Sequence, residues 1–343
     1  MNYYKTNSKS DQLIKSFFSR ELNDQETENF LKTLHEEEVI SIINCSFNLK
    51  LFDIKGFLGE FRFRNDYGSE EQSLKINPLL KHTNNMYKKC VQLITYFHEA
   101  THKKQRDFYM YNQRNNLPET TEYNKLLSRE IFCCLEAALP QYEQLLAEHD
   151  AIANSIFKYY DHLKKGNIPI CRESLTPILY ACVKYIASLN KEKHHTYCPE
   201  NYTLNCDNLL KYHQEFYNNM LVGPSYSKSN LKEVVHYSET LSSQQKKDIV
   251  NIDYTQIKDI LDNKTSHINT IMKSIYKKLL KLYTPSQKLL NYLCIDKSQW
   301  NEFVENNNMV KVAALMCDDM QTEFTLHDSI LMKTQSEEEK TCI

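Results

Sequence analysis

The sequence predicts an α+β fold dominated by α-helices, and three observations support this prediction. Glycine and proline, which mark turns, number only 5 and 8 in 343 residues, so long helices are favoured. Apolar side chains recur at spacings of three and four through most of the chain, as they do on one face of a helix. From residue 46 to Pro78 the pattern changes to alternating apolar and polar side chains, and Gly56, Gly59 and Gly68 lie in this region.

The first elements are predicted in this order. Residues 10 to 43 are expected to form helices, because apolar side chains between residues 13 and 18 share one helical face and Asn23 or Asp24 can cap the second helix. The stretch FNLKLFDIKGFLGEFRFRNDYG predicts two or three strands of a small antiparallel sheet. SLKINP predicts a further short strand that Pro78 ends.

Nearly all of the remaining chain is expected to be helical. A helix with an apolar stripe from Tyr87 to Phe97 is predicted for residues 79 to 113. The helices predicted after it cover residues 121–138, 140–165, 172–190, 206–221, 228–247, 254–283, 285–293 and 298–317.

This order of elements divides the chain into four parts. They are N-terminal helices (1–45), a core with the sheet and the 79–113 helix (46–165), a helical C-terminal lobe (166–327) and a polar tail (328–343).

Charge, apolar runs and cysteine content indicate which partners and which cellular compartment to expect. The net charge of −2 gives no reason to expect nucleic acid, and no apolar run approaches the roughly 18 residues of a membrane span. The start, MNYYKTNSKSDQL, is polar and lacks the apolar segment of a secretory signal. Eleven scattered cysteines, with Cys133 and Cys134 adjacent, indicate reduced thiols in a reducing compartment such as the cytoplasm.

One short stretch carries a chemical signal. In YFHEATHKKQ, residues 96 to 105, His98 and His102 are four residues apart and therefore lie on the same helical face. Two imidazoles so placed can bind one zinc ion, which keeps a coordination position for water in catalytic sites. Glu99 is rotated about 100° from His98 around the helix axis and can act as general base on that zinc-bound water.

The longer stretch SLKINPLLKHTNNMYKKCVQLITYFHEATHKKQ resembles the zincin metallopeptidases. The resemblance covers residues 46 to 155 and implies a zincin-like core, Zn²⁺ as cofactor and hydrolysis of peptide bonds in a protein substrate. In zincins an edge strand precedes the active-site helix and pairs with extended substrate, and LKIN is expected to be that strand.

The resemblance also implies a third ligand. The motif continues as KKQRDF, without the glycine and third histidine of the metzincins, so a gluzincin-like arrangement with a glutamate on a later helix is favoured. In AEHDAIAN, Glu148 resembles that ligand, and the small residues Ala151 and Ala153 permit a close helix approach. Glu143 and Glu136 are the second and third choices.

In gluzincins a ligand histidine often donates a hydrogen bond from its other ring nitrogen to an acidic or amide residue. The family pattern has an aspartate four residues after the glutamate, where this chain has Ile152. Asp150 and Asn154 are the candidates for this role here.

The acidic cluster SEEEK, residues 336 to 340, resembles the glutamate-rich C-terminal signals of bacterial effectors delivered by type IV secretion. The Asn-, Lys- and Tyr-rich composition is typical of an AT-rich bacterial genome. Together these features imply an effector metalloprotease that is secreted into the host cytosol and cuts a host protein such as actin. Two alternatives are a non-catalytic helical scaffold or binding effector with an unmetallated motif, and a zinc hydrolase of a non-peptide amide.

Overall fold

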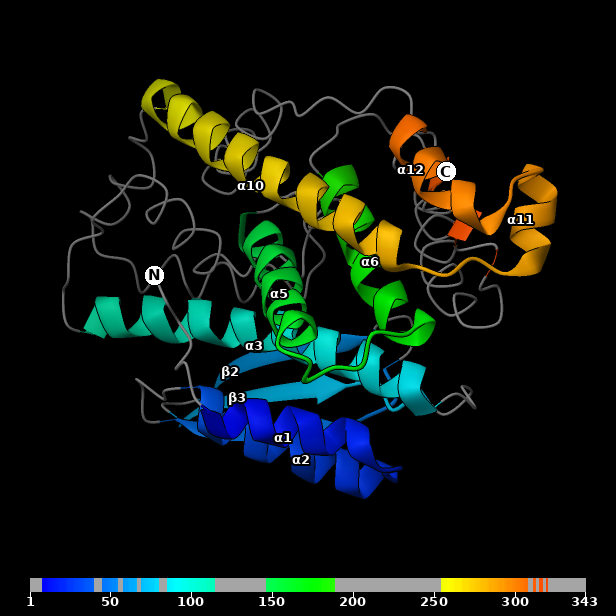
Figure 1. Ribbon diagram of the computed structural model, residues 1–343. Helices are drawn as coiled ribbons and strands as arrows, with labels where there is room; N and C mark the ends of the chain where they lie inside the picture. The colour runs from blue at the N-terminus through cyan, green and yellow to red at the C-terminus, as the bar shows by residue number, and fades with distance from the viewer. Residues whose placement is uncertain are drawn as a thin grey trace, which may run out of the picture.

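The computed structural model describes residues 8–39, 45–54, 58–66, 69–79, 85–114, 146–188 and 254–307, with a few helical residues between 311 and 319. It is mostly helical with a three-stranded sheet (Figure 1), which confirms an α+β class dominated by helices. Among the described helices, none has both the length and the apolar character that crossing a bilayer requires.

Two helices form the N-terminal part, α1 (Ser8–Ser19) and α2 (Asp24–Glu38). Asn23, rather than Asp24, caps α2. The backbone N–H of Glu26 donates to Asn23 Oδ1 at 2.9 Å, and the N–H of Asn23 donates back to Glu26 Oε2 at 3.0 Å. This reciprocal pair satisfies two backbone donors that the first helical turn leaves without partners, and so fixes where α2 begins.

The sheet contains β1 (Ser46–Leu51), β2 (Gly59–Asp66) and β3 (Ser69–Ile76) in the order β1-β3-β2. β3 pairs antiparallel with β2 but parallel with β1, so the predicted antiparallel sheet is wrong for one of its two pairings. Alternation of apolar and polar residues determines which side chains face the core, but it does not determine which strand lies next to which.

The same order corrects the predicted edge strand. LKIN belongs to β3, the central strand, and therefore cannot be the edge that pairs with a substrate. The outer edge of β1 lies against α2, where the N–H of Leu51 donates to Glu28 Oε2 at 2.8 Å. β2, the other edge strand, contacts α3.

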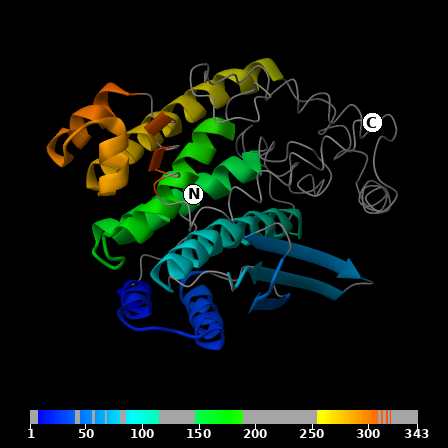
Figure 2. The same ribbon diagram turned by 90° about the vertical axis from the view of Figure 1, so that its right-hand side faces the viewer.

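The histidine-bearing helix is α3 (Asn85–Arg114). It lies between the sheet on one side and α5 (Leu146–Lys164) and α6 (Arg172–Ser188) on the other, as both views show (Figure 1 and Figure 2). The predicted start at residue 79 is wrong, because Leu79 has φ 55 and its N–H is bonded to Asn77 Oδ1 at 2.9 Å in a turn.

The remaining described helices are α10 (Tyr254–Leu282), α11 (Gln287–Leu293), the short 3₁₀ helix η3 (Lys297–Gln299) and α12 (Trp300–Asn306). α10 covers α6 and also contacts α5 and α12 (Figure 1). The helix predicted for residues 298–317 is interrupted, because α12 ends at Asn306 and the backbone of Asn307 is extended, although residues 311, 312, 315 and 316 are again helical. The helices predicted for residues 121–138, 206–221 and 228–247 and the tail from 328 lie outside the described residues.

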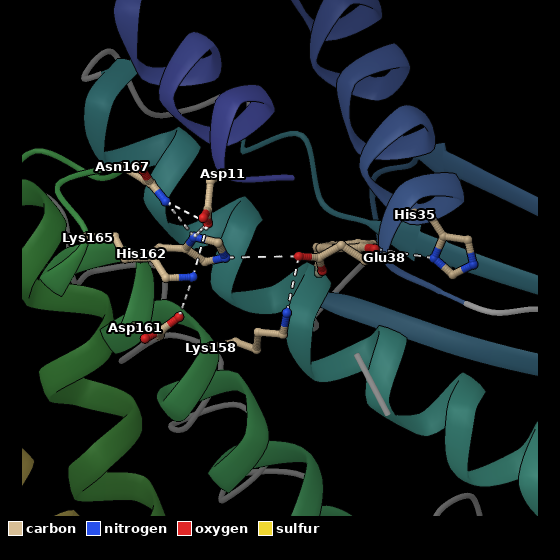
Figure 3. A network of polar contacts seen from close by, with 9 residues as sticks. Asp11, His35, Glu38, Lys158, Asp161, His162, Lys165 and Asn167 are labelled. Atoms are coloured by element: carbon tan, nitrogen blue, oxygen red, sulfur yellow. Dashed lines mark hydrogen bonds and ion pairs between the residues drawn. The ribbon is translucent and has the colours of Figure 1, made fainter. Parts of the chain in front are cut away.

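A buried polar network joins the N-terminal helices to α5 (Figure 3). His162 Nδ1 lies 3.3 Å from Asp11 Oδ1 of α1, and His162 Nε2 lies 4.0 Å from Glu38 Oε1 of α2. Lys158 Nζ is 3.3 Å from the same Glu38 oxygen, and Asn167 Nδ2 donates to Asp11 Oδ1 at 2.8 Å. The network holds α1 and α2 against the helix that carries Glu148.

This network makes stability depend on pH. Burial, together with the charge of Lys158, lowers the pKa of His162 from 6.5 to about 4, although the charge of Asp11 opposes the shift. Between these pH values the unfolded chain binds a proton that the folded chain does not. The free energy of unfolding should therefore fall by about 3 kcal/mol from this one residue as pH decreases through the window.

We expect His162→Gln to remove that part of the pH dependence, measured by urea unfolding with EDTA between pH 7.5 and pH 4. His267→Gln, at an exposed position on α10, is the matched control and should keep the wild-type slope. If the free energy of unfolding falls equally with pH in wild type and in His162→Gln, His162 is not buried in its neutral form.

Candidate metal centre

The two histidines of α3 and one glutamate of α5 converge. His98 Nε2 lies 3.1 Å from His102 Nε2 and 3.4 Å from Glu148 Oε2, and His102 Nε2 lies 3.0 Å from Glu148 Oε1. One ligand atom from each residue lies within 4.8 Å of the others. His102 and Glu148 are buried, and His98 is half-buried.

These separations fit a tetrahedral zinc ion. With zinc–ligand bonds of about 2.0–2.1 Å, two ligand atoms on a tetrahedron are about 3.3 Å apart. The separation of the two Nε2 atoms, and the separation of each from its nearer Glu148 oxygen, are close to this value. The nearer oxygen is Oε2 for His98 and Oε1 for His102, and with one ligand atom from each residue the separations stay within 4.8 Å. Two imidazole nitrogens and one carboxylate are also a donor set that zinc uses in catalytic sites, with a fourth position left for water.

Small residues bring the two helices together. Ala147 and Ala151, one turn apart on α5, are both fully buried, and Ala153 is nearly so. α5 packs directly against α3 along this face. The close approach predicted for Ala151 and Ala153 is therefore present, and it places Glu148 in the first turn of α5 facing the histidine pair.

The charges of the three groups are coupled. Burial alone would raise the pKa of Glu148, but the charges of His102 and His98 outweigh burial and hold the pKa of this carboxyl well below its usual value. Glu148 is thus kept as an anion, the form in which a carboxylate binds a metal ion.

Glu99 lies on the sheet side of the site. It is 7% exposed, and burial raises the pKa of its carboxyl, while the charges of His98 and His102 act in the opposite direction. The backbone N–H of Phe61, in β2, donates to the Glu99 carboxylate. The predicted general base is therefore held between the histidine pair and the edge strand.

Gly59, the first residue of β2, allows this close packing. A Cβ at position 59 would lie 2.6 Å from Thr95 Cγ2, 2.7 Å from Glu99 Cγ and 2.8 Å from Glu99 Oε1. These separations are shorter than van der Waals contact, so any side chain here would displace either the strand or the Glu99 carboxylate. The sequence signal was the glycine cluster, which gave no indication of which helix the glycine would meet.

The sequence predicts zinc-dependent hydrolysis with Glu99 as general base, and for such a site Gly59→Ala should lower the activity by about 10²-fold through displacement of Glu99 and leave zinc affinity unchanged. Zinc titration and turnover of the same preparation separate the two effects. Gly166→Ala is the matched control, because Gly166 has φ +69 with no atom within 4 Å of the added Cβ. It should cost about 1 kcal/mol of stability and leave the activity of the folded protein unchanged. Equal activity losses in the two variants would contradict this role of Gly59.

A buried ion pair fixes the second half of α3 on the sheet. Lys103 Nζ lies 2.5 Å from Asp107 Oδ2, and Gln72 Nε2 of β3 donates to Asp107 Oδ1 at 2.8 Å. Lys103 Nζ also lies 5.0 Å from the centre of the Phe47 ring in β1. Charged residues directly after the motif would ordinarily face solvent, but here they bind the sheet.

Two side chains, Gln105 and Asn154, bear on the predicted hydrogen bond to a histidine of the pair. His102 Nδ1 lies 3.1 Å from Gln105 Oε1, and Gln105 Nε2 donates to the carbonyl of Ala147 at 3.1 Å. The amide of Asn154, a candidate for holding a ligand ring, donates instead to the backbone oxygen of Asp150 at 2.8 Å. The alternative ligands Glu143 and Glu136 lie outside the described residues.

No family model matches this chain, and searches of curated proteins and of solved structures gave no match either. Function is therefore inferred from the chemistry of these side chains.

Proposed function

We propose that this chain is a zinc-dependent metalloendopeptidase, with His98, His102 and Glu148 as metal ligands and Glu99 as general base. One observation supports the proposal: two imidazole nitrogens of one helix and a carboxylate of another converge within 4.8 Å of one another, and the buried carboxylate of Glu99 adjoins them. Bound zinc would lower the pKa of a water molecule and polarise the carbonyl to be attacked.

The residues of the chain supply proton transfer and alignment. The Glu99 carboxylate accepts the proton of the attacking water and later donates it to the leaving amine. β2 is an edge strand and lies directly beside Glu99 through Phe61 and Gly59, so an extended chain bound alongside β2 would run past the general base. This placement supports an extended peptide as substrate over a small amide.

The proposed substrate is a host cytosolic protein, in keeping with the resemblance of the acidic cluster at residues 336–340 to effector secretion signals. Actin is the first candidate to test.

Cleavage mapping tests the proposal. Purified actin and a host cytosolic lysate are each incubated with the zinc-loaded chain or with Glu99→Gln, and newly formed peptide N-termini are identified by mass spectrometry. We expect sites that appear only with the wild-type chain. No such sites, in a chain that binds one zinc, would favour hydrolysis of a non-peptide amide. A chain that binds no zinc would instead support a non-catalytic scaffold.

A further inference from the structure

Gln105 occupies a position between the two helices that carry the proposed zinc ligands. Its side chain is 3% exposed and lies one turn after His102 on α3. Its Oε1 is 3.1 Å from His102 Nδ1, and its Nε2 donates to the carbonyl of Ala147, the residue that precedes Glu148, at 3.1 Å. A single amide therefore contacts one ligand residue and the backbone beside another.

The partners of this amide determine its orientation. A backbone carbonyl can only accept, so the NH₂ group of Gln105 must face Ala147 and the oxygen must face His102. That oxygen can only accept in turn, so the ring of His102 carries a proton on Nδ1. In the neutral ring the lone pair is then on Nε2, the nitrogen that faces His98 and Glu148.

We propose that Gln105 is a positioning residue, which fixes the ring tautomer and orientation of His102 so that Nε2 points at the metal. The inference rests on the proposed function, because it assigns a role toward the same zinc ion. The amide also joins α3 to α5 next to Glu148. Such partners of ligand histidines typically contribute about 10- to 100-fold to metal affinity.

Two substitutions separate the hydrogen bond to His102 from the hydrogen bond to Ala147. Gln105→Leu keeps similar size and removes both hydrogen bonds. Gln105→Glu keeps an acceptor for the Nδ1–H of His102 but loses the donor to Ala147. Gln92→Leu is the matched control: Gln92 is also buried on α3 and donates to backbone carbonyls, those of Asn77 and Pro78, far from the site.

The test measures zinc dissociation constants by competition with a chelating dye, together with ¹H–¹⁵N spectra of histidine-labelled, zinc-loaded protein. Urea unfolding of each variant confirms that it is folded. We expect Gln105→Leu to raise the dissociation constant about 10- to 100-fold and Gln105→Glu and Gln92→Leu to stay within about threefold of wild type. The wild-type spectrum should show the His102 proton on Nδ1, and Gln105→Leu should lose that protected signal through exchange with water.

The outcomes are distinguishable. A wild-type chain that binds no zinc would overturn the proposed function and this inference with it. A wild-type chain that binds zinc with the His102 proton on Nε2, or a Gln105→Leu variant that binds zinc as tightly as Gln92→Leu does, would overturn the inference alone.

Discussion

Replacing Glu99 with glutamine should leave one zinc per chain and lower the rate of peptide cleavage by about 10²- to 10⁴-fold. Glutamine has nearly the same shape and can still accept the hydrogen bond from the N–H of Phe61, so β2 and α3 should keep their places. It cannot accept a proton from water, however. The loss should therefore appear in kcat, with the zinc content from elemental analysis unchanged.

A second glutamate gives a matched control for this substitution. Glu28 also accepts a backbone N–H, that of Leu51, and joins α2 to the sheet away from the histidine pair. Glu28→Gln should cleave at the wild-type rate. If Glu99→Gln cleaves as fast as Glu28→Gln, the observed hydrolysis does not depend on a base at position 99.

Replacing Glu148 with alanine should weaken zinc binding by more than about 10²-fold, beyond the loss typical of residues that only support a ligand. The substitution removes one of three proposed protein ligands and the negative charge that balances the ion. Activity should fall with zinc content, and added zinc should restore part of it. Competition with a chelating dye measures the affinity, and turnover at rising zinc concentration measures the rescue.

Glu143→Ala and Glu136→Ala are the controls, since both positions were alternative ligands from the sequence. They should bind zinc as the wild type does. A larger loss in either of them than in Glu148→Ala would reassign the third ligand.

Local sequence spacing predicted much of the candidate site. The four-residue spacing of His98 and His102 is enough to place both rings on one face of α3, wherever that helix lies. Spacing alone could not identify Glu148, because it comes from another helix. It was selected by the resemblance to gluzincins. The structure brings Glu148 to the pair, although its role as a zinc ligand stays a prediction.

The helices were predictable for the same local reason. Their periodic apolar stripes gave α6 and α10 nearly to the residue. Errors came at helix ends, where short turns that periodicity does not encode interrupt the chain: the turn between Asn77 and Leu79 before α3, and the extended backbone at Asn307 after α12.

Features that depend on distant residues could not be predicted. The parallel pairing of β1 with β3 is a choice of neighbour, which alternation does not encode. Gly59 is required only because β2 meets Glu99, and Gln105 matters only because Ala147 lies across from it. Lys103 and Asp107 are buried because the sheet lies beneath them, although their sequence is typical of an exposed helical face.

The most direct test is a crystal structure of the chain grown with one equivalent of zinc, with diffraction data collected at the zinc absorption edge. It should show one anomalous peak about 2.0–2.2 Å from the Nε2 atoms of His98 and His102 and from a Glu148 carboxylate oxygen. No peak between these three side chains, or a zinc ion bound elsewhere with the two rings turned apart, would contradict the metalloendopeptidase account.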